Sequence, residues 1–505
     1  MLGKKEMGDY QTPIFFANEV CQYLKDSLNL NPDAILEPTC GKGNFIESCS
    51  IFSPKKIVGI ELNSKYADEC KTKFKESDFI SIMNENIFDF KTSSLFDSPK
   101  QLLVLGNPPW VTNTTLSFLE SKNIPHKSNF KGMNGFEALT GASNFDISEY
   151  IILSLVEEYK NTDVFFSLIS KTSVARNIYA ELKKKNISFD FFEILEIDAK
   201  KIFNVSTSAC VMVFKLSSKK NRSENLIVKN FDSPYVVVSQ YKYENHKFLL
   251  PENNAHSDFE GICCFEWRQG VKHDCSKIME FDCKENHLLN GENKIVNVEN
   301  ELLYPFMKSS MFKQAIKTEY SKNVMITQTK INQDTSYIKD KYPKSWKYLN
   351  ENAIFFDKRK SSIYSHCPKF SIFGIGDYSF SKYKVGISGF YKKPFFSLLY
   401  TETKPVMLDD TSYFIGFDTF DEAYTAMLLL NTTEVSDFLE SISFKDSKRP
   451  YTKKLLSRLD FGKMINSVDF CELQRTEKKL GLSKKINPEK YNTFKKLIPL
   501  ELGLF

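Results

Sequence analysis

The chain has 505 residues, 42% of them hydrophobic, so it is long enough for two to four domains with large cores. Its 68 Lys and Arg residues against 63 Asp and Glu residues give a net charge of only +5, which excludes a globally basic nucleic-acid binder. The 11 cysteines lack a secreted disulfide pattern, and the chain has neither an 18-residue apolar run nor a signal-peptide pattern, so we expect a cytoplasmic protein with reduced thiols and no membrane span.

The first motif combines a helix start with a glycine turn. Tyr10 and Thr12-Pro13 precede an apolar pattern of helical spacing over 15–24, and proline suits a first helical turn. A short strand over 34–36 then leads into the segment 37–46, which contains Gly41 and Gly43. Glycines in such a turn let free backbone N–H groups approach a ligand, although a generic strand-to-helix turn has the same pattern.

Acidic and amide side chains end the next two predicted strands. A strand over 56–60 ends at Glu61, whose carboxylate could accept both hydroxyls of a ribose. Its distance in sequence from Gly43 is close to the roughly 20 residues of nucleotide-binding units. The segment 85–90 carries Asn86, Ile87 and Asp89, which suit contacts to the edge and face of an adenine ring.

The strand predicted over 102–105 ends in the sequence Asn107-Pro108-Pro109-Trp110. The prolines prevent further strand pairing, and α/β sheets bind ligands at the carboxyl ends of their strands. The Asn107 amide oxygen and the Pro108 carbonyl offer two acceptors for a planar NH2 group. Trp110 offers a face for stacking a flat heterocycle, worth roughly 1–3 kcal/mol per base. The alternative interpretation is a proline turn after a core strand with an incidental tryptophan.

These motifs, in this order, resemble the gamma class of S-adenosylmethionine-dependent DNA adenine-N6 methyltransferases found in type II restriction–modification systems. The resemblance implies a Rossmann-like α/β catalytic domain over 1–230, with a mostly parallel seven-stranded sheet. The chain turns polar over 217–222, which places the domain boundary near residue 230. The resemblance implies that 231–505 is a mixed α+β domain that recognises the DNA target. The similarity is strong over roughly 1–215 and looser beyond 230.

The resemblance assigns roles to individual residues. The catalytic motif is Asn107, Pro108, Pro109 and Trp110, and Phe203 would join Trp110 in holding the target base. The cofactor S-adenosylmethionine would be bound by Tyr10, Thr12, Glu37, Thr39, Cys40, Gly41, Gly43, Phe45, Glu61, Asn86, Ile87, Asp89 and Asn107. The family often has an acid where Asn86 stands, so either Asn86 or Asp89 could contact the cofactor adenine.

The second half of the chain is locally basic and aromatic. Such a mixture suits a nucleic-acid groove, and equally an aromatic β core with a solvated lysine face. The DNA-binding candidates are Lys358, Arg359, Lys360, Lys382, Lys384, Lys448 and Arg449. A cluster of cysteines and histidines over 263–287 fits no zinc spacing, so we expect no metal and free cysteines in a β-rich core.

The sequence therefore predicts a site-specific enzyme that methylates N6 of an adenine flipped out of double-stranded DNA. Such methylation would protect the DNA from a separate cognate restriction endonuclease. The alternatives are an RNA adenine-N6 methyltransferase, a protein glutamine methyltransferase, and a catalytically inactive DNA-binding subunit. A cytosine-N4 enzyme would more often have serine in place of Asn107.

Overall fold

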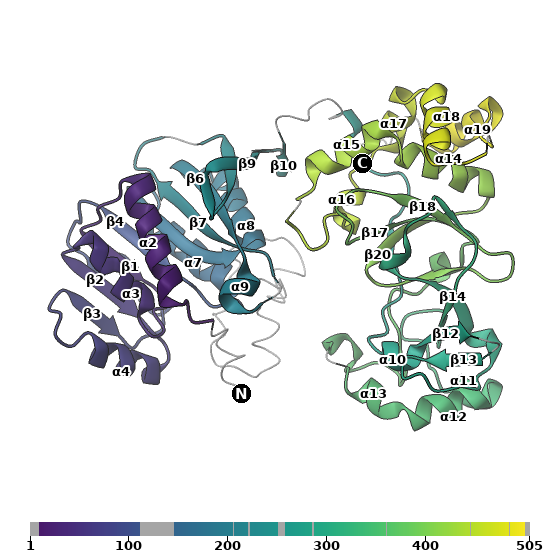
Figure 1. Cartoon of the computed structure of the whole chain (residues 1–505), viewed down its shortest axis with the longest axis horizontal. Helices are drawn as coiled ribbons and strands as arrows, with labels where there is room; N and C mark the ends of the chain where they lie inside the picture. The colour runs from purple at the N-terminus through teal and green to yellow at the C-terminus, as the bar shows by residue number, and fades with distance from the viewer. Residues whose placement is uncertain are drawn as a thin grey trace. The chain divides into compact units, whose positions relative to one another are not determined.

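The structure, a computed structural model, describes residues 10–111, 146–205, 207–220, 223–250, 258–284, 287–359, 361–444, 446–483 and 485–499. The chain divides into two compact units, Met1–Pro251 and Glu252–Phe505 (Figure 1). Among the described residues, no helix has both the length and the apolar character needed to cross a membrane.

The first unit contains one sheet in the order β10-β9-β8-β6-β7-β5-β4-β1-β2-β3. It therefore has ten strands rather than the expected seven, because β8, β9 and β10 extend the sheet beyond β6. The strands are β1 (Ala34–Glu37), β2 (Lys56–Ile60), β3 (Ile80–Met83), β4 (Leu102–Gly106), β5 (Val164–Lys171), β6 (Phe189–Ile197), β7 (Ala209–Leu216), β8 (Asn225–Asn230), β9 (Ser233–Glu244) and β10 (Lys247–Leu249).

The strand order has a switch point between β1 and β4. From β1 the chain proceeds outward through β2 and β3, then returns to place β4 on the other side of β1, all in parallel. Open α/β sheets bind ligands at the carboxyl ends of the strands at such a point. Leu36 of β1 pairs with Val104 of β4, so Glu37 and Asn107, which follow these strands, lie at the same edge.

Helices cover both faces of this sheet (Figure 1). On one face α2 (Ile14–Leu28) packs against alternate strand residues such as Leu103 and Val211. On the other face lie α7 (Ile147–Tyr159) and α8 (Thr172–Lys184), next to a column of parallel rings across three strands. In that column the ring of Phe214 stacks on Phe166 at 4.6 Å and on Phe192 at 5.0 Å. The shorter helices are α3 (Asn44–Ser48), α4 (Ser64–Lys73) and α9 (Ala199–Phe203).

The first unit extends further along the chain than the expected boundary at residue 230. Strand β8 pairs in parallel with β6, and β9 and β10 continue the same sheet to Leu249. The polar composition near residue 220 therefore marks a connection between two strands of one sheet rather than the end of a domain.

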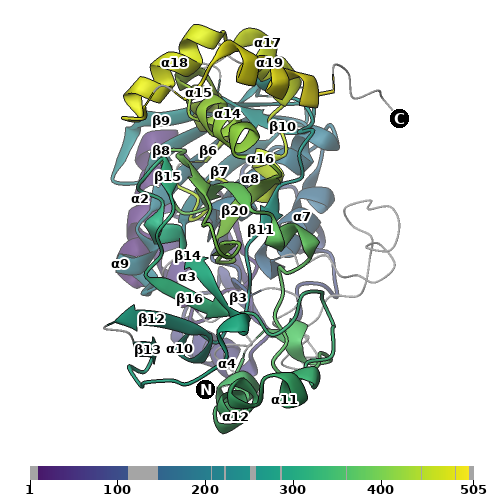
Figure 2. The same cartoon turned by 90° about the vertical axis from the view of Figure 1, so that its right-hand side faces the viewer.

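The second unit is a mixture of strands and helices with two five-stranded sheets. One sheet has the order β11-β20-β17-β18-β15 and the other β13-β12-β16-β14-β19. Within this unit, Figure 2 shows α17, α18 and α19 at one end and α11 and α12 at the other. The strands are β11 (Arg268–Gln269), β12 (Glu280–Lys284), β13 (His287–Asn290), β14 (Leu303–Met307), β15 (Ile316–Lys317), β16 (Lys322–Met325), β17 (Tyr383–Ser388), β18 (Phe396–Leu399), β19 (Met407–Leu408) and β20 (Ser412–Phe417). The helices are α10 (Ser276–Met279), α11 (Tyr337–Lys341), α12 (Pro343–Glu351), α13 (Ala353–Asp357), α14 (Phe420–Leu430), α15 (Thr433–Ile442), α16 (Lys453–Leu456), α17 (Phe461–Ser467), α18 (Phe470–Lys479) and α19 (Pro488–Leu497).

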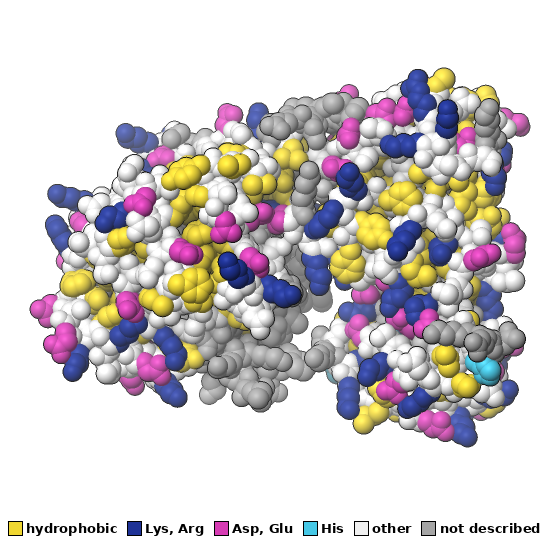
Figure 3. All heavy atoms as spheres, in the orientation of Figure 1, with side chains coloured by type: hydrophobic (Ala, Val, Ile, Leu, Met, Phe, Trp, Pro, Cys, Tyr) yellow, Lys and Arg dark blue, Asp and Glu magenta, His cyan; other side chains and the backbone are white. Residues whose placement is uncertain are grey.

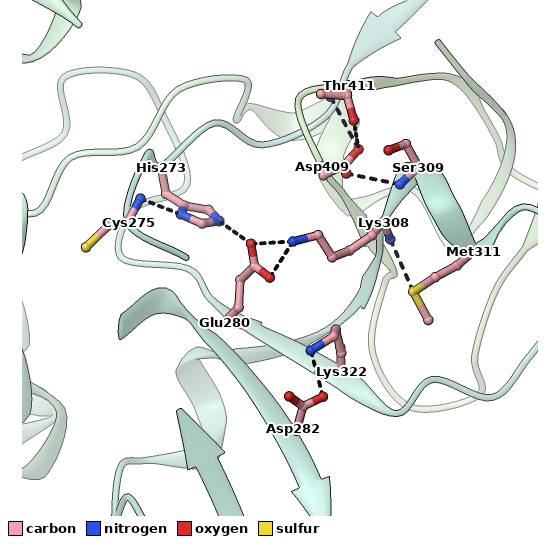
Figure 4. A network of polar contacts seen from close by, with 10 residues as sticks. All are labelled: His273, Cys275, Glu280, Asp282, Lys308, Ser309, Met311, Lys322, Asp409 and Thr411. Atoms are coloured by element: carbon pink, nitrogen blue, oxygen red, sulfur yellow. Dashed lines mark hydrogen bonds and ion pairs between the residues drawn. The ribbon is translucent and has the colours of Figure 1, made fainter. Parts of the chain in front are cut away.

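A buried polar network lies beside β12 and β14 (Figure 4). Glu280 lies between Nε2 of His273, at 3.6 Å, and Nζ of Lys308, at 2.7 and 2.9 Å. Burial and the nearby Lys308 and Arg359 lower the pKa of His273 to about 4, and its Nδ1 accepts a hydrogen bond from the backbone N–H of Cys275. Both ring nitrogens of His273 thus have protein partners. Within the described ranges, no three His, Cys, Asp or Glu side chains gather in a way that could hold a metal ion.

Candidate active site

A small pocket opens at the switch point of the first unit's sheet. It brings together residues from three separate segments: the start of α2, the turn after β1 and the end of β4. The lining residues are Tyr10, Gln11, Thr12, Glu37, Thr39, Cys40, Gly41, Asn44, Phe45 and Asn107. Eight of the residues that the sequence assigns to the cofactor or to catalysis therefore line a single pocket.

The glycine turn is bound to the end of β2 through the carboxylate of Glu61. The Gly41 N–H donates to Oε2 of Glu61 at 2.7 Å, and the Asn63 N–H donates to Oε1 of the same carboxylate at 2.7 Å. Gly41 has a φ of +51°, and a Cβ there would lie 2.6 Å from Oε1 of Gln11. A side chain at position 41 would therefore be strained and would collide with the pocket wall.

Gln11 and Asn44, neither of which was predicted as a site residue, join the start of α2 to the glycine turn. Gln11 Oε1 accepts from the Lys42 N–H at 3.1 Å, and Asn44 Nδ2 donates to the Thr12 carbonyl at 2.7 Å. The only sequence signal for Gln11 and Asn44 was their position inside the motif before α2 and the glycine turn. Their role depends on these two segments lying next to each other in space.

Glu37 is a buried carboxyl at the end of β1, only 3% exposed. Burial, together with repulsion from Cys70, Cys21 and Glu61, raises its pKa well above the usual range. Its Oε2 has no hydrogen-bond partner within the described residues, and nor does the Thr39 hydroxyl in the same pocket. Unpaired buried polar atoms cost about 1–3 kcal/mol each, so their presence in a pocket points to a polar ligand. An ammonium group next to Glu37 would satisfy its carboxylate.

Asn107 presents its amide oxygen at the tip of β4. Its Nδ2 donates to the Tyr10 carbonyl at 2.9 Å, and this bond uses the donor side of the amide. Its Oδ1 is buried and has no hydrogen-bond partner among the described residues. The side chain therefore presents its amide oxygen as a hydrogen-bond acceptor.

Aromatic rings surround the same tip. The Trp110 ring is 6% exposed and lies 5.6 Å from the Tyr10 ring and 5.3 Å from the Phe203 ring. The planes of Trp110 and Phe203 are 70° apart, so the two rings meet edge to face. Phe203 therefore does lie beside Trp110. A flat base between them would require the two rings to separate and become parallel.

The remaining predicted cofactor residues do not line this pocket. Gly43 packs under the turn, where a Cβ would lie 2.7 Å from the Phe74 ring. Asn86 uses its side-chain oxygen to accept from the Phe88 N–H at 3.2 Å, while Asp89 is exposed.

The DNA-binding candidates of the second unit occupy different environments. Lys358, Lys382 and Lys448 are exposed, and Lys360 lies outside the described residues. Arg359 is partly buried, donates to the Ser371 carbonyl at 2.6 Å and stacks on the Tyr364 ring.

Lys384 is not a surface residue, which corrects the expectation for this position. It is 1% exposed in β17, and its Nζ donates to the Ser381 carbonyl at 2.8 Å. The side chain lies near the Phe414 ring in the core, where it cannot reach a phosphate. Burial lowers the pKa of its ammonium group to about 7.

Lys448 and Arg449 both lie over the ring of Phe390, at 6.0 and 5.2 Å from its centroid. Phe390 also lines a surface groove, and we call this groove, together with Lys448 and Arg449, the Phe390 groove. Figure 3 shows dark-blue basic side chains beside yellow hydrophobic ones on the visible face of the second unit. The lining residues of the groove are Phe312, Lys313, Phe390, Tyr391, Lys392, Lys393 and Phe395.

Comparison with known proteins finds a relative along nearly the whole chain. The chain is 37% identical over 469 residues to the type II methyltransferase M.NspV of Nostoc sp., a match that covers 90% of this chain and 96% of that protein. It is 25% identical over 215 residues to the modification methylase CviBIII of Paramecium bursaria Chlorella virus NC1A, which covers 42% of this chain and 51% of that one. No protein-family model matches the chain. Among solved structures, the type IIG restriction endonuclease BpuSI aligns with 93% of this chain and 60% of its own at 14% identity, with a TM-score of 0.35, too low to support a conclusion.

The buried ammonium of Lys384 gives a prediction on stability and pH. Its pKa is about 7 in the folded state and about 10.4 when unfolded, so between these values the unfolded chain binds more protons. The free energy of unfolding should therefore rise with pH over this window, by up to about 1.4 kcal/mol per pH unit. In Lys384→Met this pH-dependent contribution to stability should disappear.

Urea unfolding of wild type and Lys384→Met at pH 7, 8 and 9 measures this contribution, and Lys382→Met, at an exposed position, is the control. Parallel pH profiles for wild type and Lys384→Met would contradict a buried, neutralised lysine.

Proposed function

The chain belongs to the type II methyltransferases, and from this premise we propose that it methylates N6 of an adenine within a specific sequence of double-stranded DNA. Its cofactor is S-adenosylmethionine. The observation that carries the proposal is the buried Oδ1 of Asn107, which has no hydrogen-bond partner among the described residues, while the amide nitrogen donates to the Tyr10 carbonyl. The modified DNA would be resistant to a separate cognate restriction endonuclease.

The pocket at the switch point has groups that suit S-adenosylmethionine. Oε2 of Glu37, which has no partner among the described residues, would accept from the amino group of the methionine part of the cofactor. Glu61 would accept from the ribose hydroxyls, as acids at the tip of a second strand do in nucleotide-binding sheets. When bound, S-adenosylmethionine supplies an electrophilic methyl group.

Asn107 and Pro108 would act on the target amine. The amino group of adenine is a poor nucleophile because its lone pair is delocalised into the ring. Acceptance of its two N–H hydrogens by Asn107 Oδ1 and the Pro108 carbonyl would orient the nitrogen and favour tetrahedral geometry. The same two acceptors would stabilise the positive charge that develops on the nitrogen during methyl transfer.

The aromatic rings at the tip would hold the target base outside the DNA duplex. Flipping a base out of duplex DNA costs a few kcal/mol, and stacking on an aromatic side chain stabilises the flipped base by roughly 1–3 kcal/mol. Trp110 offers a ring beside Asn107, and Phe203 would rotate away from its edge-to-face contact to let the base enter.

RNA adenines and glutamine side chains carry the same planar NH2 group, so the acceptor pair alone does not choose between substrates. The Phe390 groove favours a nucleic acid, because it combines exposed cations with an aromatic surface. Among its residues, Lys313, Lys393 and Lys448 are exposed and available to phosphates.

Replacing Asn107 tests the catalytic role. In Asn107→Ala, methyl transfer to duplex DNA should fall by roughly 100-fold or more, because a preorganised acceptor at the reacting atom is lost. Affinity for S-adenosylmethionine should change much less. Transfer of radiolabelled methyl to DNA, with calorimetric titration of the cofactor, measures both quantities.

Asn18→Ala, at an exposed position on α2, is the matched control. Full DNA methylation by Asn107→Ala would contradict the assignment. If the wild type binds the cofactor and methylates RNA or protein but not DNA, the substrate is RNA or protein. If the wild type neither binds S-adenosylmethionine nor transfers methyl groups, the chain is a catalytically inactive DNA-binding subunit.

Neutralising the Phe390 groove tests the DNA contact. Lys313→Gln, Lys393→Gln and Lys448→Gln should each weaken DNA binding and lower the slope of log affinity against log salt by about 1. Fluorescence anisotropy at several salt concentrations measures this slope. Lys339→Gln, an exposed lysine on α11, is the control. Unchanged slopes in all three variants would place the DNA elsewhere.

A further inference from the structure

Lys171 contacts the catalytic tip from the neighbouring strand. Strands β4 and β5 pair in parallel up to Gly106 and Leu168. Lys171 lies three residues beyond Leu168, and Pro109 lies three residues beyond Gly106. The ends of the two strands are therefore level with each other. From this position Lys171 Nζ donates to the Trp110 carbonyl at 3.4 Å.

The same ammonium group pairs with a buried acid. Lys171 Nζ lies 2.5 Å from Oδ2 of Asp146, and the two side chains are 24% and 7% exposed. Oδ1 of Asp146 caps α7, accepting from the N–H of Ser148 at 3.2 Å and from its hydroxyl at 2.6 Å. Lys171 thus connects the catalytic tip on one side with the start of α7 on the other.

A second bond joins the same two segments. The Ile147 N–H donates to the Val111 carbonyl at 2.8 Å, and both residues are buried. Trp110, Val111, Asp146 and Ile147 are all less than a tenth exposed. The ion pair and the backbone bond form a clamp beside Asn107. Without Lys171, the carboxylate of Asp146 would be buried without its ion-pair partner, which strongly destabilises a local structure.

The tip needs such a clamp because proline geometry fixes only part of it. Pro108 and Pro109 restrict their own φ angles but donate no backbone N–H to any neighbour. The carbonyl of Pro108 must nevertheless stay aligned with Oδ1 of Asn107. Misplacement of a reacting group by about 1 Å can cost on the order of 100-fold in rate.

We propose that Lys171 is a positioning residue for methyl transfer, which fixes the Asn107–Trp110 tip against the start of α7 through the Trp110 carbonyl and Asp146. This inference rests on the proposed function. It predicts that Lys171 acts on the rate of transfer and not on cofactor affinity, because it touches the tip and not the pocket around Glu37 and Gly41.

The test compares Lys171→Met with the conservative Lys171→Arg in the full chain. Lys171→Met should lower kcat for methyl transfer to DNA by at least about 10-fold, with KM for DNA and the affinity for S-adenosylmethionine within about 2-fold of wild type. Lys171→Arg, which keeps a cation within reach of both partners, should recover most of kcat. A parallel loss of cofactor affinity, or an arginine variant as slow as the methionine variant, would overturn the positioning role.

Hydrogen exchange gives a second readout that does not depend on catalysis. In Lys171→Met, exchange of the Ile147 and Ser148 amides should be at least about 10-fold faster, while peptides from β1 and β2 remain protected as in wild type. Unchanged exchange at Ile147 would overturn the clamp even if the protein methylated no DNA. Faster exchange in Lys171→Met, together with a wild type that methylates no DNA, would support the clamp and reject the proposed function, and with it the role of Lys171 in catalysis.

Discussion

Asn107 donates its amide N–H to the carbonyl of Tyr10, and the chemistry available at the end of β4 depends on this bond. The bond uses one of the two Nδ2 hydrogens and fixes the orientation of the amide, so that the buried Oδ1 is presented as an acceptor. The bond also joins segments 97 residues apart in sequence, so the segment before α2 must lie beside the catalytic tip. The switch point between β1 and β4 makes this possible, because it places Glu37 and Asn107 at the same edge of the sheet.

Several buried polar atoms of the site have no partner within the part of the chain that the structure describes, and the packing of the surrounding sheet offsets that cost. Unpartnered atoms on Glu37, Thr39 and Asn107 would each cost about 1–3 kcal/mol. The sheet behind them is packed on both faces, including the stacked rings centred on Phe214. A rigid sheet that holds unsatisfied groups toward one pocket is preorganised for a ligand that satisfies them.

Local signals in the sequence predicted the central strands and most of the pocket. Strand β4 is a continuous apolar run because both of its faces are buried, and Pro13 precedes α2 as a proline at a helix start should. Features that depend on distant partners were missed. Pairing of β8 with β6 moved the domain boundary, and a core environment near Phe414 buried Lys384, a residue type that usually marks a surface. Gln11 was missed for the same reason, since its partner Lys42 is 31 positions away.

Single-molecule sequencing of DNA from a host that expresses the protein would show directly which base, if any, it methylates. We expect N6-methyladenine at one short motif throughout the genome, and none in cells that carry the empty vector. Methylation at N4 of cytosine, or unmodified DNA in the presence of folded protein that binds S-adenosylmethionine, would contradict this expectation.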